Sequence, residues 1–245
     1  MSWMERKDLK DRMDSVELHS LEHLVSSRWS CRGYLEDPVD HQRIVRLLEI
    51  AQRAPSWCNT QPWQLIVTEG DGTARFRHAL REYASRHYAD IESDIPMPRE
   101  YTGMSLARRR ESGWQLYEAV GVARGDREAS ALQAMKNFEL FGAPHVAIVT
   151  VDESLGAYGI LDCGVYVANF LLAAQALGLA AIPQAALARY SPFVREYFNI
   201  PAGRAVLLGI SFGLADHTHS ANTYRTQRAA LDEVVQWHSS AGTAR

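Results

Sequence analysis

The chain has 245 residues, of which 47% are hydrophobic and 22% are charged. These values are ordinary for a globular protein and allow one domain with a sizeable core. Lys and Arg number 26 against 29 for Asp and Glu, which leaves a net charge of -3. That balance excludes the general basic surface of a nucleic-acid-binding protein, so we expect no nucleic-acid partner.

Cysteine usage and the two chain ends bear on the compartment. Cys31, Cys58 and Cys163 are widely spaced and free of any CxxC pattern, which argues against a disulfide framework and a zinc ribbon. Residues 1–14 are charged throughout and lack the apolar core of a secretory signal. We therefore expect a cytoplasmic protein, with residues 1–14 as a flexible N-terminal segment and 239–245 as a disordered tail.

Residues 15–238 are predicted to form a single domain, because no linker or repeat divides them. Their longest apolar stretch, residues 164–182, is interrupted by Asn169 and Gln175 and lacks basic flanks. We interpret it as a buried helix leading into a strand rather than a membrane span, and expect no membrane partner.

Periodicity predicts the elements along the chain. Helices are expected over residues 15–27, 40–53, 73–90, 104–122, 127–140, 158–178 and 227–237, with Asp40 typical of an N-cap. Short β-rich runs predict buried strands at 63–68, 145–151 and 205–212. The fold class is therefore α+β with helices dominant. Residues 91–103 carry two prolines and few apolar side chains, so we expect the region of about 91–124 to resemble a lid.

Several familiar catalytic motifs are missing. The sequence has no GxGxxG after a strand, no GxxxxGK[ST], no HExxH and no GxSxG, which removes support for Rossmann, P-loop, zinc-protease and α/β-hydrolase readings. His19 and His23 are spaced i,i+4, but no third ligand is evident nearby, so a solvated helix face is favoured. We predict no metal site.

Two arginine clusters could bind an anion. Arg28, Ser30 and Arg32 lie within five residues, and guanidinium groups pair well with phosphate. Residues 222–228 contain Arg225 and Arg228 just ahead of the last predicted helix, whose positive end would favour an anion. The alternative for both clusters is a solvated surface.

The loop of residues 54–63, APSWCNTQPW, is the densest polar cluster. Its two prolines restrict the path of the chain, while Ser56, Asn59 and Gln61 present donors and acceptors. Such a loop could bind an aromatic heterocycle, although a structural turn would tolerate the same composition.

Taken in chain order, the three clusters resemble the FMN-dependent nitroreductase family. Residues 28–32 are similar to its RxSxR-type segment, and residues 54–63 are similar to its APSxxNxQPW loop. Residues 178–184 stand where the family has a glycine-led segment beside the flavin ring. Residues 209–216, 222–228 and 231–233 resemble its C-terminal signature, so the resemblance spans 15–237. Residues 108–119 and 137–144 are further similar to the branch with nitrobenzoate-type reductases.

The resemblance implies a nitroreductase-like three-layer fold, with a central mixed β-sheet flanked by helices, in an intertwined homodimer with FMN at the interface. The implied cofactor-binding residues are Arg28, Trp29, Ser30, Arg32, Pro55, Ser56, Trp57, Asn59, Gln61, Pro183, Gln184, Arg225 and Arg228. The arginines and Ser30 would hold the phosphate and ribityl chain, with Arg225 a weaker candidate, and Arg28 or Arg32 could instead face the ring pyrimidine. Residues 55–61 would reach FMN from the other subunit.

The resemblance also implies a ping-pong reaction. Hydride passes from NADPH or NADH to flavin N5, the nicotinamide leaves, and a small aromatic acceptor takes the same slot. No catalytic side chain is required, and a nitrobenzoate-like acceptor would be reduced to the hydroxylamine. The candidate substrate residues are Trp57, Arg109, Trp114 and Tyr117. Trp57 and Cys58 replace small or polar residues common in the family, which predicts a narrower or more aromatic pocket.

Other interpretations stay open at this point. Reductive dehalogenases and flavin dehydrogenases share the fold, so the acceptor could be another class of molecule. The protein could also bind or sense FMN without turnover. A third alternative is an interaction module without flavin, in which case the motif matches would be coincidental. For Cys58, the interpretation as a small packed thiol is favoured over that as a catalytic nucleophile. The run 108–110 is favoured as a solvated helix face, and core packing is the simpler account of Trp114 and Tyr117.

Overall fold

The computed structural model of the protein describes residues 16–238. Four strands form one central sheet in the order β1-β2-β4-β3. They are β1 (Trp63–Thr68), β2 (His145–Asp152), β3 (Ala180–Gln184) and β4 (Arg204–Gly213). The segments expected at 1–14 and 239–245 lie outside the described residues.

All three strand pairings in the sheet are antiparallel, so the four strands do not form the mixed sheet that the resemblance implied. Parallel pairing within residues 16–238 is limited to isolated bridges, Ser30 with Ala181 and Glu92 with Tyr190. The segment around Ser30, which lies beside β3, makes only one such bridge. Within residues 16–238 it therefore adds no fifth strand to the sheet.

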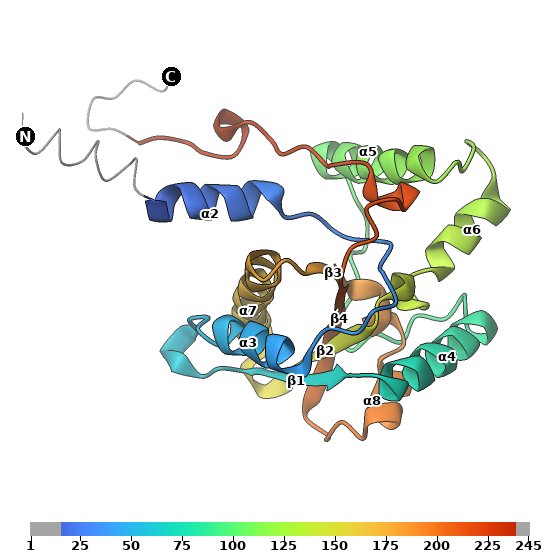
Figure 1. Ribbon diagram of the computed structural model, residues 1–245, viewed down its shortest axis with the longest axis horizontal. Helices are drawn as coiled ribbons and strands as arrows, with labels where there is room; N and C mark the ends of the chain where they lie inside the picture. Colours follow the sequence, from blue (N-terminus) through green and yellow to red (C-terminus); the bar gives the residue numbers. More distant parts are fainter. Residues whose placement is uncertain (1–15, 239–245) are drawn as a thin grey trace, which may run out of the picture.

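Helices cover both faces of the sheet (Figure 1), which confirms the three-layer α+β prediction. α3 (His41–Ala51) and α7 (Gly156–Ala176) pack on one face around Phe170 and Phe212. α4 (Asp71–Arg86) and α8 (Ser191–Phe198) pack on the other around Phe76 and Tyr190. β2 is buried on both faces from His145 to Val151, which explains its continuous apolar sequence.

Two local predictions about helices are confirmed. The Asp40 side chain accepts the N–H of Arg43 at 3.2 Å and so caps α3. The apolar stretch around residue 164 forms α7, a core helix that leads into β3. Within residues 16–238, Glu153–Ala176 is the one helical stretch long and apolar enough to cross a membrane, and 44% of its apolar window is buried inside the protein.

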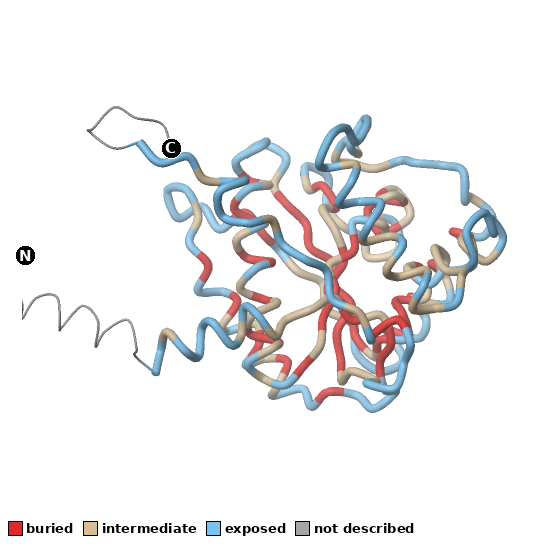
Figure 2. The backbone as a smooth tube through the Cα atoms, turned by 90° about the horizontal axis from the view of Figure 1, so that it is seen from above, coloured by how far each residue is buried: buried red, intermediate tan, exposed pale blue. Residues whose placement is uncertain are grey.

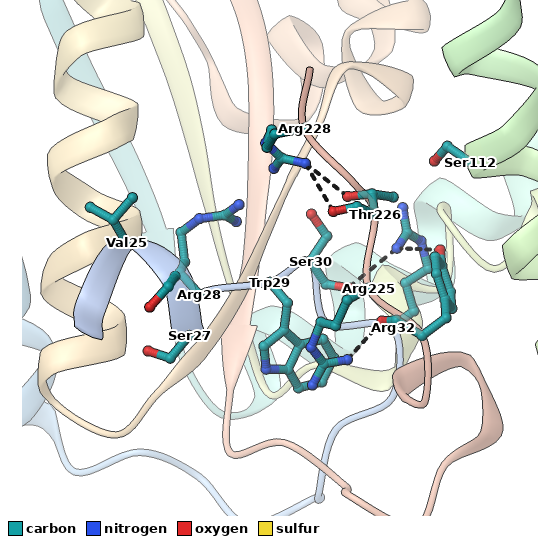
Figure 3. A pocket seen from close by; sticks show the side chains of 12 residues that line it. Val25, Ser27, Arg28, Trp29, Ser30, Arg32, Ser112, Arg225, Thr226 and Arg228 are labelled. Carbon is teal, nitrogen blue, oxygen red and sulfur yellow. Dashed lines mark hydrogen bonds between the residues drawn. The ribbon is translucent and has the colours of Figure 1, made fainter. Parts of the chain in front are cut away.

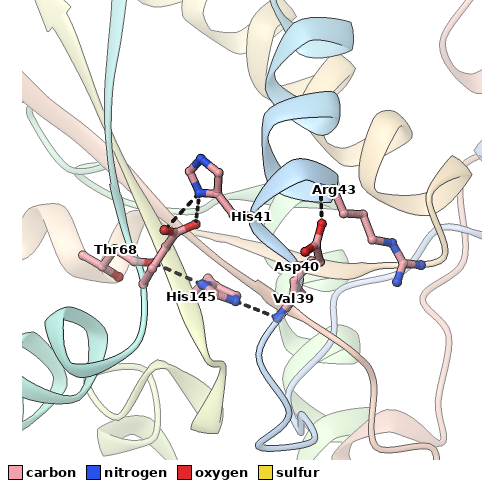
Figure 4. Close-up of polar contacts among 7 residues, drawn as sticks. Val39, Asp40, His41, Arg43, Thr68 and His145 are labelled. Atoms are coloured by element: carbon pink, nitrogen blue, oxygen red, sulfur yellow. Dashed lines mark hydrogen bonds and ion pairs between the residues drawn. The ribbon is translucent and has the colours of Figure 1, made fainter.

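His145 joins the start of α3 to the sheet (Figure 4). Its Nε2 accepts the backbone N–H of Val39 at 2.9 Å, and its Nδ1 lies 3.1 Å from the Thr68 carbonyl oxygen. The two bonds together require a neutral ring that donates from Nδ1. Nearby, the exposed His41 pairs with Glu69 at 3.0 Å.

Three helices have no buried residue: α2 (Val16–Ser27), α5 (Gly103–Ala119) and α6 (Arg127–Met135). In Figure 1, α2, α5 and the C-terminal stretch lie outside the three layers. Figure 2 shows the same stretches as mostly exposed, in contrast to the buried strands. They project from the core and are free to form a site or an interface.

The helix predicted over 227–237 is wrong, because this stretch is extended apart from a 3₁₀ turn at Leu231–Glu233. Its apolar residues Leu231, Val234 and Trp237 remain 64%, 64% and 79% exposed. An amphipathic segment needs a packing partner to become a stable helix, and residues 16–238 leave these apolar side chains uncovered. Helix α8, which the periodicity argument missed, begins with Pro192 in its first turn.

Candidate functional site

A cavity of about 450 Å³ lies where the end of α2, the following segment and the C-terminal stretch meet. It brings together six of the residues predicted from the sequence: Arg28, Trp29, Ser30, Arg32, Arg225 and Arg228. Ser112 of α5, Tyr224 and Thr226 also line it and were not predicted. Tyr224 and Thr226 lie within the cluster of residues 222–228, whereas Ser112 comes from a separate stretch of the chain.

The first arginine segment is fixed against the sheet. Ser30 bridges to Ala181 of β3, and the Cys31 N–H donates to the Ala181 carbonyl at 3.4 Å. Gly33 follows directly, and a Cβ there would lie 2.2 Å from the His219 side chain. Only glycine lets the two segments approach so closely.

Asn222 ties the two arginine segments together. Its Oδ1 accepts the Arg32 N–H at 2.8 Å, and its Nδ2 donates to the carbonyls of Gly33 and Asp216, both at 2.8 Å. Asn222 is buried, so these bonds are protected from competing water. The hydrogen bonds of a single amide side chain thus join the N-terminal and C-terminal parts of the site.

The cavity is strongly cationic. Four arginines line it, and no Asp or Glu is among the lining residues that the structure describes. Burial lowers the pKa of the Arg28 guanidinium, and the positive charge of Arg228 lowers it further. Figure 3 shows both side chains directed into the same part of the cavity. Two uncompensated guanidiniums in this position favour an anion such as phosphate.

The other two arginines are held more tightly. One Nη of Arg32 donates to the Ser30 carbonyl at 3.2 Å and to the Tyr224 hydroxyl at 3.0 Å. The Arg225 guanidinium lies 4.2 Å from the centre of the Trp29 ring, a cation–π contact, and donates to the Asn222 and Tyr224 carbonyls. Arg225 and Trp29 therefore form a wall of the cavity.

The predicted loop residues Pro55, Ser56, Trp57, Asn59 and Gln61 do not line this cavity. All of them except the half-buried Ser56 are exposed. The loop lies between α3 and β1, whereas the cavity is formed by α2, α5 and the C-terminal stretch. Within one chain, the loop and the cavity are therefore separate.

Pro183 and Gln184 lie in β3, outside the lining of the cavity. Gln184 is buried, and its Nε2 donates to the Asn137 carbonyl at 3.0 Å while its Oε1 accepts from the Ser211 hydroxyl. Its side chain is thus occupied inside the chain.

The three candidate substrate residues on α5 lie away from the core. Arg109 lies 4.9 Å from the Tyr101 ring centre, and Trp114 meets Tyr117 edge to face at 6.0 Å. Because α5 has no buried residue, the alternative that Trp114 and Tyr117 pack in the core is wrong. Of this helix, Ser112 lines the cavity.

Thiol or metal chemistry finds little support in the described residues. Burial raises the pKa of Cys31, and it raises the pKa of Cys163 to about 12, so neither is a thiolate at neutral pH. Cys58 is exposed, so the interpretation of it as a packed thiol is wrong. Residues 16–238 contain no cluster of three His, Cys, Asp or Glu side chains suited to a metal ion.

Comparison with known proteins agrees with this geometry. The model of the nitroreductase family matches residues 25–214. The chain belongs to the nitroreductase family. It is 34% identical over 219 residues to the nitroreductase NfnB of Mycolicibacterium smegmatis, covering 88% of this chain and 92% of that protein. It is 31% identical over 225 residues to a 4-nitrobenzoate reductase of a Nocardioides species, covering 89% and 90%.

A solved structure supports the same placement. The crystal structure of the FMN-dependent nitroreductase NfnB from Mycobacterium smegmatis, in complex with NADPH, superposes with a TM-score of 0.86 at 32% identity. It covers 90% of this chain and 99% of that one. The nitroreductase fold expected from the sequence is thereby confirmed, as is the likeness to the branch that includes nitrobenzoate reductases.

Proposed function

We propose that this nitroreductase-family protein is an FMN-dependent oxidoreductase that uses NADPH or NADH to reduce a nitroaromatic acceptor. The observation that carries the proposal is the cavity lined by four arginines and free of acidic side chains within the described chain. A flavin mononucleotide brings a phosphate dianion, which is the group that such a cavity recognises. The similarity to nitroreductase NfnB and to a 4-nitrobenzoate reductase supports the choice of cofactor and reaction.

The residues in the cavity divide the work of binding FMN. Arg28 and Arg228 would hold the phosphate, since their guanidiniums are close together and lack a carboxylate partner. Ser30 would add a hydroxyl beside them. Arg32 would face the ring pyrimidine, where a cation stabilises the negative charge of the reduced ring. The wall formed by Trp29 and Arg225 would limit the space around the cofactor.

When bound, FMN would supply the redox chemistry, taking a hydride from NADPH or NADH and passing it to the acceptor in a ping-pong cycle. The chain contributes binding, orientation and charge, so no acid or base from a side chain is needed. We propose a nitrobenzoate-like acceptor reduced to the hydroxylamine, with Trp57, Arg109, Trp114 and Tyr117 around it. The similarity to a 4-nitrobenzoate reductase supports this substrate class.

We propose that the working unit is a homodimer with FMN at the interface. Within one chain, residues 55–61 lie apart from the arginine cavity. None of the residues of α2, α5 and α6 is fully buried, and among them Val16, Leu21 and Leu132 are exposed apolar side chains. A second copy would cover these apolar residues and bring its own loop to the flavin.

The region of about 91–124 belongs to the same domain in this proposal and acts as a lid. Its start is anchored, because Asp94 accepts the Val206 N–H at 2.8 Å and pairs with Arg195. Beyond this anchor, α5 has no buried residue and places Ser112 at the cavity. A cytoplasmic location completes the proposal, supported by the three free cysteines.

An absorption spectrum of the protein reconstituted with FMN, taken before and after anaerobic NADPH or NADH, tests the proposal. We expect a bound flavin whose visible bands bleach with the nicotinamide and return when 4-nitrobenzoate is added. Bound flavin that does not bleach would indicate a protein that binds or senses FMN. Bleached flavin that is reoxidised by a haloaromatic but not by a nitroaromatic would indicate a reductive dehalogenase, and a colourless protein would contradict the proposal.

A further inference from the structure

The loop between α3 and β1 has an unusual backbone. Cys58, Asn59 and Gln61 have φ angles of 51°, 56° and 47°. This left-handed conformation is disfavoured for residues other than glycine, although asparagine tolerates it better than most. The turn Trp57–Asn59 has no buried residue, so packing in the core does not maintain it. Other contacts must hold the loop in this shape.

Hydrogen bonds hold the end of the loop and tie it to α3. The Gln61 N–H donates to the Ser56 hydroxyl at 2.9 Å, which closes the loop on itself. Gln52, at the end of α3, donates to the Gln61 side chain at 3.0 Å and accepts from the Trp63 indole at 3.0 Å. These bonds hold the second half of the loop and leave Trp57 to be held from elsewhere.

Asp162 of α7 holds the first half of the loop. The backbone N–H of Trp57 lies 3.2 and 3.1 Å from the two carboxylate oxygens of Asp162. Asp162 is 8% exposed and forms no ion pair within residues 16–238. Burying a carboxylate is unfavourable unless its oxygens are bonded. The buried Asp162 carboxylate bonds to an exposed loop and not to another core residue, which indicates a role outside the core.

Tyr158 holds the Trp57 side chain from the same helix. The two ring centres are 4.5 Å apart with the planes inclined by 59°. Tyr158 and Asp162 are spaced i,i+4, so they lie on one face of α7. Trp57 and Tyr158 are 60% and 58% exposed. The pair therefore forms a fixed aromatic surface directed away from the core.

We propose that Asp162 is a positioning residue of the flavin site. Its carboxylate fixes the loop of residues 56–61, and with Tyr158 it holds Trp57 as a rigid wall that limits the size of the aromatic acceptor. This inference rests on the proposed function, in which the loop reaches FMN bound by the second subunit. It predicts two separable effects: Asp162 governs how the loop meets FMN, and Tyr158 governs acceptor choice.

The first test uses Asp162→Asn and Asp162→Leu in the full chain. The FMN dissociation constant of the apoprotein is measured by quenching of flavin fluorescence, alongside its urea unfolding midpoint. We expect the Leu variant to weaken FMN affinity roughly tenfold, because a charge-assisted bond to the loop is lost. The Asn variant keeps one acceptor oxygen and should lose less. The urea midpoint should change little, because the leucine removes a buried charge, and this offsets the loss of the hydrogen bonds to the loop.

The second test uses Tyr158→Ala, with Tyr88→Ala as a control at another exposed tyrosine. The measured quantity is the ratio of kcat/KM for 4-nitro-1-naphthoate to that for 4-nitrobenzoate. We expect the Tyr158 variant to raise this ratio roughly tenfold, since a pocket wall of this kind discriminates by size. The change should appear in the KM of the larger acceptor, while the FMN dissociation constant stays that of the wild-type protein. Tyr88→Ala should leave the ratio as it is.

The possible failures are distinguishable. The proposed function, and this inference with it, would be overturned if the wild-type protein binds no FMN. The same holds if neither NADPH nor NADH bleaches the bound flavin. An active wild-type protein whose Asp162→Leu variant keeps its FMN affinity within about twofold, or loses only stability, would overturn the positioning role alone. An unchanged acceptor ratio in Tyr158→Ala would overturn the role of Tyr158 and Trp57 as a wall that limits acceptor size. If the Leu variant does not fold, the Asn and Tyr158 variants decide.

Discussion

The sheet with its four covering helices and the segments around the arginine cavity are built in opposite ways. β2 is buried from His145 to Val151, and α7 places Phe170 and Tyr166 in a continuous core. In contrast, α2 and α5 bury no residue, and none from 223 to 238 is buried. The comparison shows that the segments that form the core are not those that line the candidate cavity. Stability and cofactor binding should therefore respond to different substitutions.

The largest effect is expected in the core. Phe170 is fully buried and meets Phe212 edge to face at 5.5 Å. Phe170→Ala should lower the free energy of unfolding by about 3–5 kcal/mol, because it leaves a cavity as well as removing apolar contacts. Urea denaturation of the apoprotein measures this change. A loss below about 1 kcal/mol would show that this layer is not the tightly packed core described above.

The next effect falls on the cofactor and spares the fold. Arg228→Ala should weaken FMN binding by about 1.5–3 kcal/mol, the value of a hydrogen bond to a charged group. The stability of the apoprotein should change little, because within residues 16–238 the Arg228 side chain donates hydrogen bonds only to its neighbours Thr226 and Gln227. Fluorescence titration with FMN measures the affinity. Arg46→Ala, at an exposed arginine of α3, is the control, and equal losses in both variants would remove Arg228 from the site.

A smaller effect concerns pH and separates core from site again. Burial lowers the pKa of His145, although its bond to Thr68 opposes the shift. In the unfolded chain the pKa is about 6.5, so on acidification the unfolded state takes up a proton before the folded state does. The stabilisation is therefore complete above about pH 6.5 and declines as the pH falls below it.

This sign can be checked with His145→Gln. The urea midpoint of the wild-type protein should fall between pH 7.5 and 5 by more than that of the variant. Parallel slopes in the wild-type protein and His145→Gln would show that this ring does not carry the pH dependence.

The smallest effect is expected where the site segments touch each other. Arg108 of α5 pairs with Glu233 at 3.0 Å, and both side chains are about half exposed. Exposed ion pairs contribute about 0–1 kcal/mol, so Arg108→Ala should change the free energy of unfolding by less than about 1 kcal/mol. A larger loss in urea denaturation would mean that α5 and the C-terminal stretch belong to the cooperative core.

Sequence reasoning succeeded where a local pattern determines the structure. The cap at Asp40, the continuous apolar strand β2 and the apolar helix α7 each follow from residues close together in the chain. The two arginine segments were also predicted to share a site, and the cavity brings them together. That prediction came from the resemblance to a family, since no spacing rule relates residues about 200 positions apart.

The failures have a common physical cause. The stretch 227–237 has helical periodicity, but within residues 16–238 its apolar side chains Leu231, Val234 and Trp237 remain exposed. Asn222, which joins the arginine segments, carries no local signal, because its bonds reach Arg32 and Gly33 across the fold. The proposed role of Asp162 likewise depends on its hydrogen bond with the Trp57 N–H, which lies far from it in the sequence. Such contacts are tertiary and cannot be derived from spacing.

The most direct test of the central claim compares the affinities of the apoprotein for FMN and for riboflavin, which lacks the phosphate. If the acid-free arginine cavity holds that phosphate, the wild-type protein should prefer FMN by roughly tenfold or more, and Arg28→Ala and Arg228→Ala should each reduce this preference. Equal affinity for both flavins, or a preference that survives the loss of both arginines, would contradict the account.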